Sequence, residues 1–335
     1  MPAVALSVVI VNWNGRRYLP DCLAALVPQL PDGAELIVVD NGSRDGSREW
    51  LAQQAGVTLV ALEENVGFAA GVNAGLRVAS GEAILLLNND AFVEPGCVAA
   101  FCAALRDHPD AAAFGGVLLF DHAPHLVASA GIVMHCDGLA LDLWPCRPLA
   151  SVPAQPQPIF GPSGGLALYR RTLLDDIGWF DARFFAYLED ADLAVRAVLR
   201  GWRSLVIPAA RARHIYSATG VHGSPFKSRL LARNRWRVIV RGFPAATLVR
   251  CALPIAGYEL AACVVALLTR RWAALAGRLE ALGELHRLLA ERRAILHRRH
   301  AGDLLGRALA PARWPWQLHA GQRRLDEVLR ARRAP

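Results

Sequence analysis

The segment Tyr187–Arg200 (YLEDADLAVRAVLR) carries three carboxylates, Glu189, Asp190 and Asp192, within four residues. Carboxylates held this close repel one another, which raises the pKa of one of them and makes it a candidate general base. The structural alternative is an acidic first turn that stabilises an amphipathic helix through the helix dipole. The aromatic-rich approach FDARFFAY favours the functional interpretation.

Asp90 is a second candidate, because it ends the apolar run of LLLNNDAFVEPG. A single carboxylate at a crevice can hold Mg²⁺ or Mn²⁺, which take oxygen ligands and complete their shell with substrate phosphates. His214, in RHIYSATG, follows the expected strand Ser204–Ile207 and is a candidate second metal ligand or hydrogen-bond donor to phosphate. The alternatives are a helix cap near Pro95 for Asp90 and an ordinary structural role for the histidine.

Polar residues of two further segments are candidates for ligand contact. Asp40, in VVDNGSRDGS, can accept hydrogen bonds from a base or a ribose, or it can begin a turn. NVGFAAGVNAGL offers Asn65 and Asn73, and its glycines, Gly67 among them, permit close backbone approach. The segment matches neither the dinucleotide fingerprint nor the P-loop, and its structural alternative is a glycine-rich helix packed on a sheet.

Strands and helices alternate in the first third of the chain. Apolar runs predict strands at residues 5–11, 36–39, 57–61 and 84–87, and helical spacing predicts helices at 18–30, 47–54 and 69–79. This alternation predicts an α/β fold with an open, mainly parallel central sheet flanked by helices. Ligands of such sheets bind outside the carboxyl ends of the strands. Asn12, Asp40 and Asp90 each follow a strand, so we expect them to line one crevice.

Composition and charge divide the chain of 335 residues, whose formal net charge is +8. Residues 1–226 hold 15 Lys+Arg and 22 Asp+Glu, whereas residues 227–335 hold 22 Lys+Arg and 7 Asp+Glu. The apolar content excludes a disordered chain, and seven cysteines without a C-x-x-C pair indicate a reducing compartment without a disulfide framework. The chain opens on an apolar run that is typical of a buried strand and not of a signal peptide.

The basic C-terminal part has three interpretations. Arginines beside Leu, Ile and Trp in Lys227–Arg241 and Arg270–Arg299 favour a surface that meets anionic lipid. A nucleic-acid interface is disfavoured because no binding signature accompanies the charge, and a solvated helical bundle or oligomer interface is the remaining alternative. Cys251–Leu268 approaches the length of a membrane span, but it contains Pro254 and Glu259. A half-inserted or interfacial segment therefore agrees with the sequence at least as well as a true span.

Seven segments, in order, resemble family 2 glycosyltransferases with the GT-A fold. They are VVIVNWNG, VVDNGSRDGS, NVGFAAGVNAGL, LLLNNDAFVEPG, GPSGGLALYRR, GWFDARFFAYLEDADLAVRAVLRGW and HIYSATG. The resemblance covers roughly residues 5–240 and, within the family, is to rhamnosyltransferase-like enzymes of bacterial cell-surface polysaccharide assembly. It implies a catalytic domain at residues 1–240 and an α-helical region at 241–335.

The resemblance also implies residue roles. Asp190, paired with Glu189, matches the catalytic base, while Asp90 matches the last position of a D-x-D metal motif that here reads Asn88-Asn89-Asp90, with His214 completing the metal site. Contacts to the nucleotide sugar are implied for Val11, Asn12, Asn14, Asp40, Asn65, Gly67, Asn73, Asn89 and Asp90. Contacts to the transferred sugar or the acceptor are implied for Gly164, Gly165, Trp179 and Asp192.

The expected activity is an inverting transfer of a sugar, with Mg²⁺ or Mn²⁺, from a nucleotide-diphosphate donor to a glycan or lipid-linked acceptor. No nucleic-acid partner is expected, and a homo-oligomer is compatible with the sequence. The expected location is the cytoplasmic face of the cell membrane, as a peripheral protein. A metal-dependent nucleotidyltransferase and a catalytically inactive GT-A scaffold are the alternatives.

Overall fold

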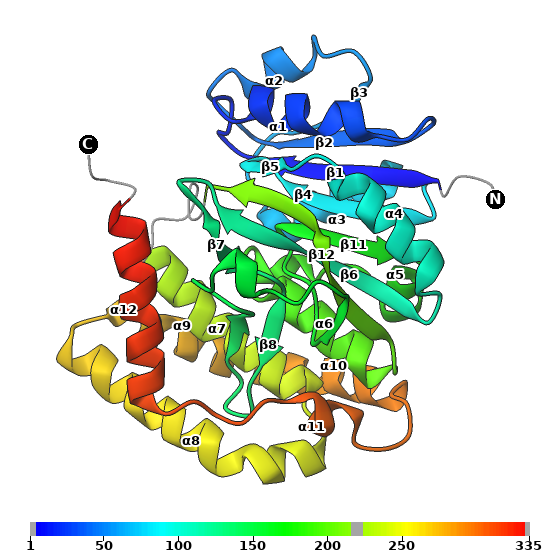
Figure 1. Cartoon of the computed structure of the whole chain (residues 1–335). Coiled ribbons are helices and arrows are strands. Elements are labelled where there is room, and N and C mark those ends of the chain that lie inside the picture. Colours follow the sequence, from blue (N-terminus) through cyan, green and yellow to red (C-terminus); the bar gives the residue numbers. More distant parts are fainter. Residues whose placement is uncertain (1–4, 216–223, 332–335) are drawn as a thin grey trace.

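A computed structural model describes residues 5–215 and 224–331, except for the side chain of Pro315. Its centre is a ten-stranded sheet in the order β10-β12-β6-β11-β4-β1-β2-β3, with β5 beside β12 and β7 beside β6. In Figure 1 the N-terminal strands form one end of the molecule, and the C-terminal helices gather at the opposite end. The fold is therefore α/β with a C-terminal helical region, as predicted.

The four strands β1–β4 run parallel and form one half of the sheet. Their bounds are Leu6–Asn12 (β1), Glu35–Asn41 (β2), Val57–Leu62 (β3) and Ala83–Asn88 (β4). Helices cover both faces, so successive residues of β1 enter different cores: Val8 packs in the cluster that contains α1 and α4, and Val9 packs in the cluster that contains α3. A strand buried on both faces needs an unbroken apolar run, which explains the sequence of β1.

Three helices connect these strands and lie close to the predicted positions, and a fourth follows the last of them. Their bounds are Leu19–Leu26 (α1), Ser47–Leu51 (α2), Phe68–Val78 (α3) and Cys97–Asp107 (α4). The predicted helix at 18–30 divides into α1 and a 3₁₀ turn, Val27–Gln29. Pro28 lies in this turn, where it cannot donate the backbone hydrogen bond that would continue an α-helix.

The other half of the sheet is mixed, which corrects the prediction of a mainly parallel sheet. β11 runs antiparallel between β4 and β6, while β12 is parallel to β6 and antiparallel to β5 and β10. The chain reaches β11 through irregular structure instead of a helical crossover, so nothing requires the parallel direction. The bounds are Ala91–Val93 (β5), Ala111–Phe120 (β6), Ala123–Ser129 (β7), Gln157–Ile159 (β10), Leu166–Arg170 (β11) and Arg203–His214 (β12).

Short elements complete this half. A separate hairpin contains Ile132–Met134 (β8) and Ala140–Asp142 (β9), and two 3₁₀ turns cover Leu149–Ser151 and Ala182–Phe184. Two helices, Arg171–Ile177 (α5) and Glu189–Leu199 (α6), follow β11. The carboxylate cluster of the sequence thus forms the first turn of α6.

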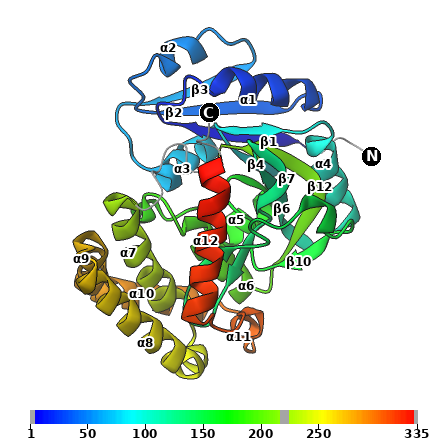
Figure 2. The same cartoon turned by 60° about the vertical axis from the view of Figure 1, so that its left-hand side comes forward.

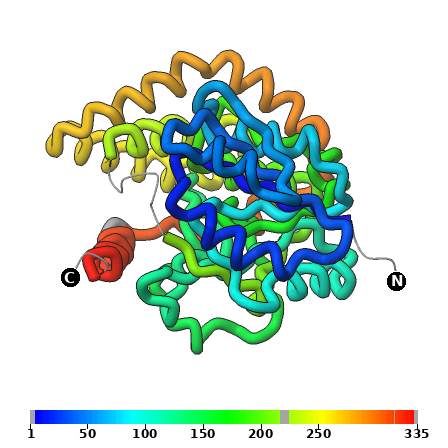
Figure 3. Tube along the Cα trace, turned by 90° about the horizontal axis from the view of Figure 1, so that it is seen from above, coloured from blue at the N-terminus to red at the C-terminus, as the bar shows by residue number. Residues whose placement is uncertain are grey.

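Six helices make up the C-terminal region, seen from two further directions in Figures 2 and 3. They are Pro225–Gly242 (α7), Ala245–Leu268 (α8), Trp272–Gly283 (α9), Leu285–His297 (α10), Leu304–Ala308 (α11) and Pro315–Ala331 (α12). α7 packs against α6, α9 and α10, and α12 returns to the part of the molecule that holds the large sheet, where Leu325 and Val328 pack against the hydrophobic core. The helical region is therefore packed directly behind the helix that carries the acidic cluster.

The arginines of α7 do not form the free basic surface expected of this stretch. Arg235, Arg237 and Arg241 are buried, and each forms an ion pair: Arg235 with Glu259 (2.7 Å), Arg237 with Glu284 (2.6 Å) and Arg241 with Asp181. A buried charge must be paired, because leaving water is otherwise too costly. Much of the positive charge of α7 is thus neutralised inside the protein.

Candidate active site

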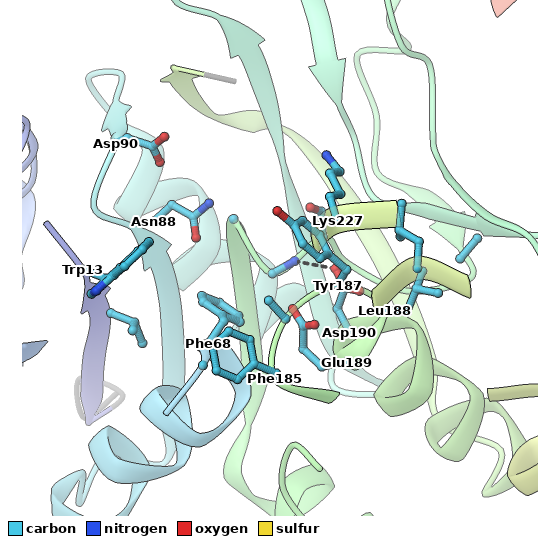
Figure 4. Close-up of a pocket in the computed structure, with 18 of the residues that line it drawn as sticks. Trp13, Phe68, Asn88, Asp90, Phe185, Tyr187, Leu188, Glu189, Asp190 and Lys227 are labelled. Carbon is cyan, nitrogen blue, oxygen red and sulfur yellow. Dashed lines mark hydrogen bonds between the residues drawn. The ribbon is translucent and has the colours of Figure 1, made fainter. Parts of the chain in front are cut away.

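A cavity of about 700 Å³ lies at the carboxyl ends of β1 and β4, facing the loop before α6. Figure 4 shows Asp90 on one wall and the pair Glu189 and Asp190 on the opposite wall. A cavity of this size accommodates a small ligand with a limited number of polar contacts. Its location agrees with the rule that ligands of α/β sheets bind beyond the carboxyl ends of the strands.

A buried polar network supports the wall at the ends of β1 and β2. Asn12 Nδ2 donates to Asp40 Oδ1 (3.2 Å) and to Ser43 Oγ (3.2 Å), and Asn12 Oδ1 accepts from Asn89 Nδ2 (2.7 Å). Asn12 and Asp40 are fully buried neighbours on adjacent strands and do not line the cavity. Satisfied buried networks of this kind fix loop geometry. Here the network holds Asn89, which does line the cavity, beside Asp90.

A second set of amides shapes the cavity beyond the carboxyl end of β2. Asn41 Nδ2 donates to Asn65 Oδ1 (3.0 Å) and to the Gly67 carbonyl (3.1 Å), and Asn41 Oδ1 accepts from the Val66 amide (3.0 Å). Gly67 has φ +87°, and a Cβ there would lie 2.5 Å from the Phe185 carbonyl oxygen. Only glycine combines this backbone conformation with so close an approach. The contact joins the segment around Gly67, beyond the end of β2, directly to the loop before α6.

Asp90 and His214 meet at the edge of the cavity. His214 Nε2 lies 3.1 Å from Asp90 Oδ1 and 3.3 Å from Asn88 Nδ2, and Asp90 is buried although it lines the cavity. Burial lowers the pKa of His214, but the charge of Asp90 and its hydrogen bond outweigh this and raise the pKa above its ordinary value. A carboxylate, an imidazole and an amide at one edge form a donor set for a cation or for a proton.

Glu189 and Asp190 form the acidic wall. Burial raises the pKa of Glu189 well above its usual range, and the adjacent charge of Asp190 raises it further. Burial and the charge of Asp142 raise the pKa of Asp190, although its carboxylate accepts hydrogen bonds from the amides of Gly164 (3.0 Å) and Ala191 (2.8 Å). These backbone donors favour the charged form of Asp190. The pair therefore holds one proton more readily on Glu189, leaving Asp190 as the carboxylate.

The loop that presents this pair is strained. Phe185, Tyr187 and Leu188 have φ values of 65°, 69° and 67°, which side chains with a Cβ adopt at a cost of about 1–3 kcal/mol each. Asn234 on α7 is fully buried, and its Nδ2 donates to the carbonyls of Phe184 (3.0 Å), Ala186 (3.0 Å) and Tyr187 (2.8 Å). One amide from the C-terminal region thus holds the loop in its unfavourable conformation.

The predicted site residues fall into two groups. The cavity is lined by Val11, Asn65, Gly67, Asn89, Asp90, Gly164, Gly165, Glu189 and Asp190. The second group, Asn12, Asn14, Asp40, Asn73, Trp179, Asp192 and His214, does not line it. Of the predicted motif HIYSATG, residues 216–220 lie outside the described part of the chain.

Side chains of the second group bond to other protein groups in this structure, and their expected ligand contacts stay predictions. The Asn14 side chain accepts from the Arg44 amide (2.8 Å), and Asn73 donates to the Phe180 carbonyl (2.7 Å) and accepts from its amide (3.2 Å). Asp192 pairs with Arg196 (2.9 Å).

Several residues that line the cavity were not among the predicted site residues. Trp13, Phe68, Asn88, Asp142 and Tyr187 line the cavity, and Lys227 lines it as well. Trp13, Phe68, Asn88 and Tyr187 lie within or beside the quoted motifs, so proximity to a motif could have indicated them. Asp142 comes from the β8–β9 hairpin and Lys227 from the first turn of α7, both outside the quoted motifs.

The sequence matches the model of the family described as "Glycosyl transferase family 2" over residues 7–178. This region holds β1–β4, Asp90 and the Gly164–Gly165 pair. The chain belongs to glycosyltransferase family 2. Because nucleotidyl transfer is a different reaction, family membership leaves glycosyl transfer as the chemistry to explain.

Two bacterial relatives of this glycosyltransferase show similar coverage. The "N-acetylglucosaminyl-diphospho-decaprenol L-rhamnosyltransferase" of Mycobacterium tuberculosis is 28% identical over 233 residues, covering 62% of this chain and 75% of the relative. The "Uncharacterized glycosyltransferase YwdF" of Bacillus subtilis is 28% identical over 221 residues, covering 64% of this chain and 75% of the relative. The resemblance thus extends well beyond the short motifs.

Solved structures share the fold of this glycosyltransferase. GalNAc-T7 with UDP, GalNAc and Mn²⁺ superposes with a TM-score of 0.60 at 19% identity, over 72% of this chain and 48% of that chain. S. aureus TarS 1–349 gives a TM-score of 0.55 at 17% identity, over 87% of this chain and 89% of that chain. At these identities the likeness establishes the GT-A fold alone.

Asn234→Ala tests the support of the strained loop. The substitution removes a donor from three carbonyls, one of which, that of Phe184, also accepts from Arg233 Nη2 (3.0 Å) and the Ala186 amide (2.8 Å). We therefore expect the free energy of unfolding to fall by about 1–3 kcal/mol in urea titrations. Arg229→Ala, on the same helix but in an exposed ion pair, is the control, and we expect it to cost less than about 1 kcal/mol. Equal losses in the two variants would contradict a special role for Asn234.

Proposed function

We propose that this glycosyltransferase moves a sugar from a nucleotide-diphosphate donor to a hydroxyl group of a lipid-linked glycan acceptor, with inversion at the anomeric carbon. The observation that carries the proposal is a single cavity with Asp90 on one wall and Glu189 and Asp190 on the other. The printed name of the mycobacterial relative supports a rhamnosyl donor and a diphospholipid-linked acceptor. Roles in bacterial cell-surface polysaccharide assembly follow from the same likeness.

Asp90 and His214 fit a divalent cation of the Mg²⁺ or Mn²⁺ type. No group of three His, Cys, Asp or Glu side chains suited to a metal occurs within the described residues, so the donor diphosphate must supply further oxygen ligands. Two solved proteins of this fold contain Mn²⁺, one with UDP and one with GDP-Man, which supports a metal of this kind. When bound, the cation neutralises charge that develops on the leaving nucleotide. Trp13 lines the same cavity.

Asp190 acts as the general base in this proposal. The acceptor oxygen attacks the anomeric carbon, the bond from that carbon to the diphosphate oxygen breaks, and the hydroxyl proton passes to Asp190. The Gly164 and Ala191 amides orient the carboxylate and favour its charged form. Glu189 keeps the shared proton, which prevents two adjacent negative charges in a buried site. One displacement of this kind inverts the configuration.

Two matched substitutions test whether Asp190 acts as the base while Asp90, on the opposite wall of the cavity, holds the metal. Asp190→Asn removes the base, so we expect sugar transfer to fall by roughly 10²–10⁴-fold while Mn²⁺-dependent binding of nucleoside diphosphates is retained. Asp90→Asn removes the metal ligand, so that same binding weakens and loses its response to Mn²⁺. Transfer is measured with a panel of nucleotide sugars, and binding is measured by calorimetry. Wild-type turnover in Asp190→Asn would refute the assigned base.

The pH dependence of transfer reports the pKa of Asp190. The base works only when ionised, and its raised pKa places the loss of activity at a higher pH than the value of about 3.9 for a free aspartate. Asp142→Asn removes a negative charge that raises this pKa, so the acidic limb of the kcat/KM profile shifts to lower pH. Asp175→Asn, at an exposed position on α5, leaves the limb in place. A limb that stays fixed or rises in Asp142→Asn contradicts this electrostatic account.

We infer that α8 lies on a membrane surface. It is the only helix in residues 5–215 and 224–331 that is long and apolar enough to cross a bilayer, and just 17% of its apolar window is buried. Leu253 and Leu260 on α8 are 86% and 69% exposed. Glu259, on the same helix, is bound by Arg235 and Arg278, an ion-pair cluster that favours an interfacial helix over a membrane span.

Negative charge introduced on the exposed face of α8 tests whether this face contacts a membrane surface. We expect the double variant Leu253→Glu/Leu260→Glu to lose at least tenfold in binding to anionic liposomes, because it removes the apolar contact and adds repulsion. The matched control Val27→Glu/Val78→Glu alters two exposed valines away from α8, which are 50% and 48% exposed. Co-sedimentation measures both. Equal binding by the two variants would exclude α8 as the contact surface.

A further inference from the structure

Lys227 is the only lysine in the 335-residue chain, and it points into the cavity. It lies in the first turn of α7, and its Nζ is 5.0 Å from the centroid of the Tyr187 ring. Among the described residues that line the cavity, it is the only cationic side chain. Figure 4 shows Lys227 on the side of Tyr187 and Asp190, away from Asp90.

Within the described residues Lys227 forms no ion pair, whereas the arginines of the same helix are all paired. Each arginine of α7 forms an ion pair with an Asp or Glu: Arg229, Arg233, Arg235, Arg237 and Arg241. In the described parts of the chain, no carboxylate lies within ion-pair distance of the Lys227 ammonium, and its close contact is the Tyr187 ring. Burial lowers the pKa of Lys227, and the charge of Asp142, which lines the same cavity, offsets this only in part. Among the described residues the ammonium therefore has an acidic neighbour but no ion pair, which leaves it able to bind an anionic group of a ligand.

Apolar side chains on the same turns of α7 lie next to this cation. Phe226 and Leu231 line the cavity, and they are 54% and 37% exposed. Phe226 also contacts Phe185 of the strained loop edge-on, with ring centroids 5.8 Å apart. A charged group inside the cavity with an apolar rim outside it suits an amphiphile that has an anionic head and a hydrocarbon chain.

We propose that Lys227 binds the phosphate of the lipid-linked acceptor, and that Phe226 and Leu231 contact the first part of its hydrocarbon chain. This inference rests on the proposed function and identifies the acceptor end of its cavity. The donor diphosphate offers the same chemical group, but it belongs with Asp90 on the opposite wall. An ammonium–phosphate pair in a cavity with limited access to water is stronger than the same pair at an exposed surface.

Binding of simple probes to the full chain tests this assignment without any turnover. Calorimetry compares the binding of geranyl diphosphate, of geraniol and of a nucleoside diphosphate (UDP, GDP or dTDP), the last measured in the presence of Mn²⁺. We expect wild-type protein to prefer geranyl diphosphate over geraniol by at least tenfold, and Lys227→Gln to reduce this preference to threefold or less. Lys227→Arg retains most of it. Arg229→Gln, two residues along the same helix, is the matched control and keeps the wild-type preference.

Each other outcome overturns the proposal. Wild-type protein without a preference for the diphosphate excludes an acceptor phosphate site, and an unchanged preference in Lys227→Gln excludes the lysine. If Lys227→Gln weakens nucleoside diphosphate binding as much as geranyl diphosphate binding, or more, Lys227 serves the donor. Failure of the proposed function is separate, because it appears as no transfer from any nucleotide sugar while the probe titrations keep their expected pattern. Thermal unfolding of each variant verifies that it is folded.

Discussion

The active site depends on one constraint: three residues with side chains must hold left-handed backbone conformations immediately before α6. Phe185, Tyr187 and Leu188 turn the chain so that Glu189 and Asp190 face the cavity instead of solvent. The free energy that this conformation costs is offset by the Asn234 amide and by the close contact with Gly67. Asn234 belongs to α7, so the loop that presents the acidic pair is held by a contact with the C-terminal helices.

Electrostatics explain the division of charge along the chain. The cavity is lined by several carboxylates and one lysine, so in the proposed mechanism an anionic substrate is bound by a cation at Asp90 and by Lys227. The arginines of α7 are used internally, where they bind acidic residues of α8, α9 and α10 and of the loop before α6. Part of the excess of positive charge after residue 226 therefore fixes α7 behind the site through ion pairs.

Much of the framework was predictable from the sequence because local patterns determine it. The apolar runs of β1, β2 and β4 and the positions of Asp90 and Asp190 follow from residues that are close in the chain. Asn12 and Asp40 were correctly expected at strand ends, yet their side chains bond to each other and do not line the cavity. Sequence spacing locates a side chain at the crevice, but it does not say whether another protein group already uses its hydrogen bonds.

What escaped prediction depends on contacts between distant segments. The antiparallel insertion of β11, the bonds from Asn234 to the loop before α6, and the arrival of Asp142 and Lys227 at the cavity each join residues far apart in sequence. No local pattern records such pairings, and the periodicity of α7 does not distinguish a paired arginine from a free one.

The stereochemistry of the product tests the central claim most directly, namely that Asp190 activates the acceptor for a single displacement across the cavity. With a nucleotide sugar that the enzyme turns over, proton NMR of the glycoside reports the configuration at the anomeric carbon. The account predicts a product with the configuration opposite to that of the donor. A product that retains the donor configuration would contradict it, because retention requires a second displacement or attack on the same face.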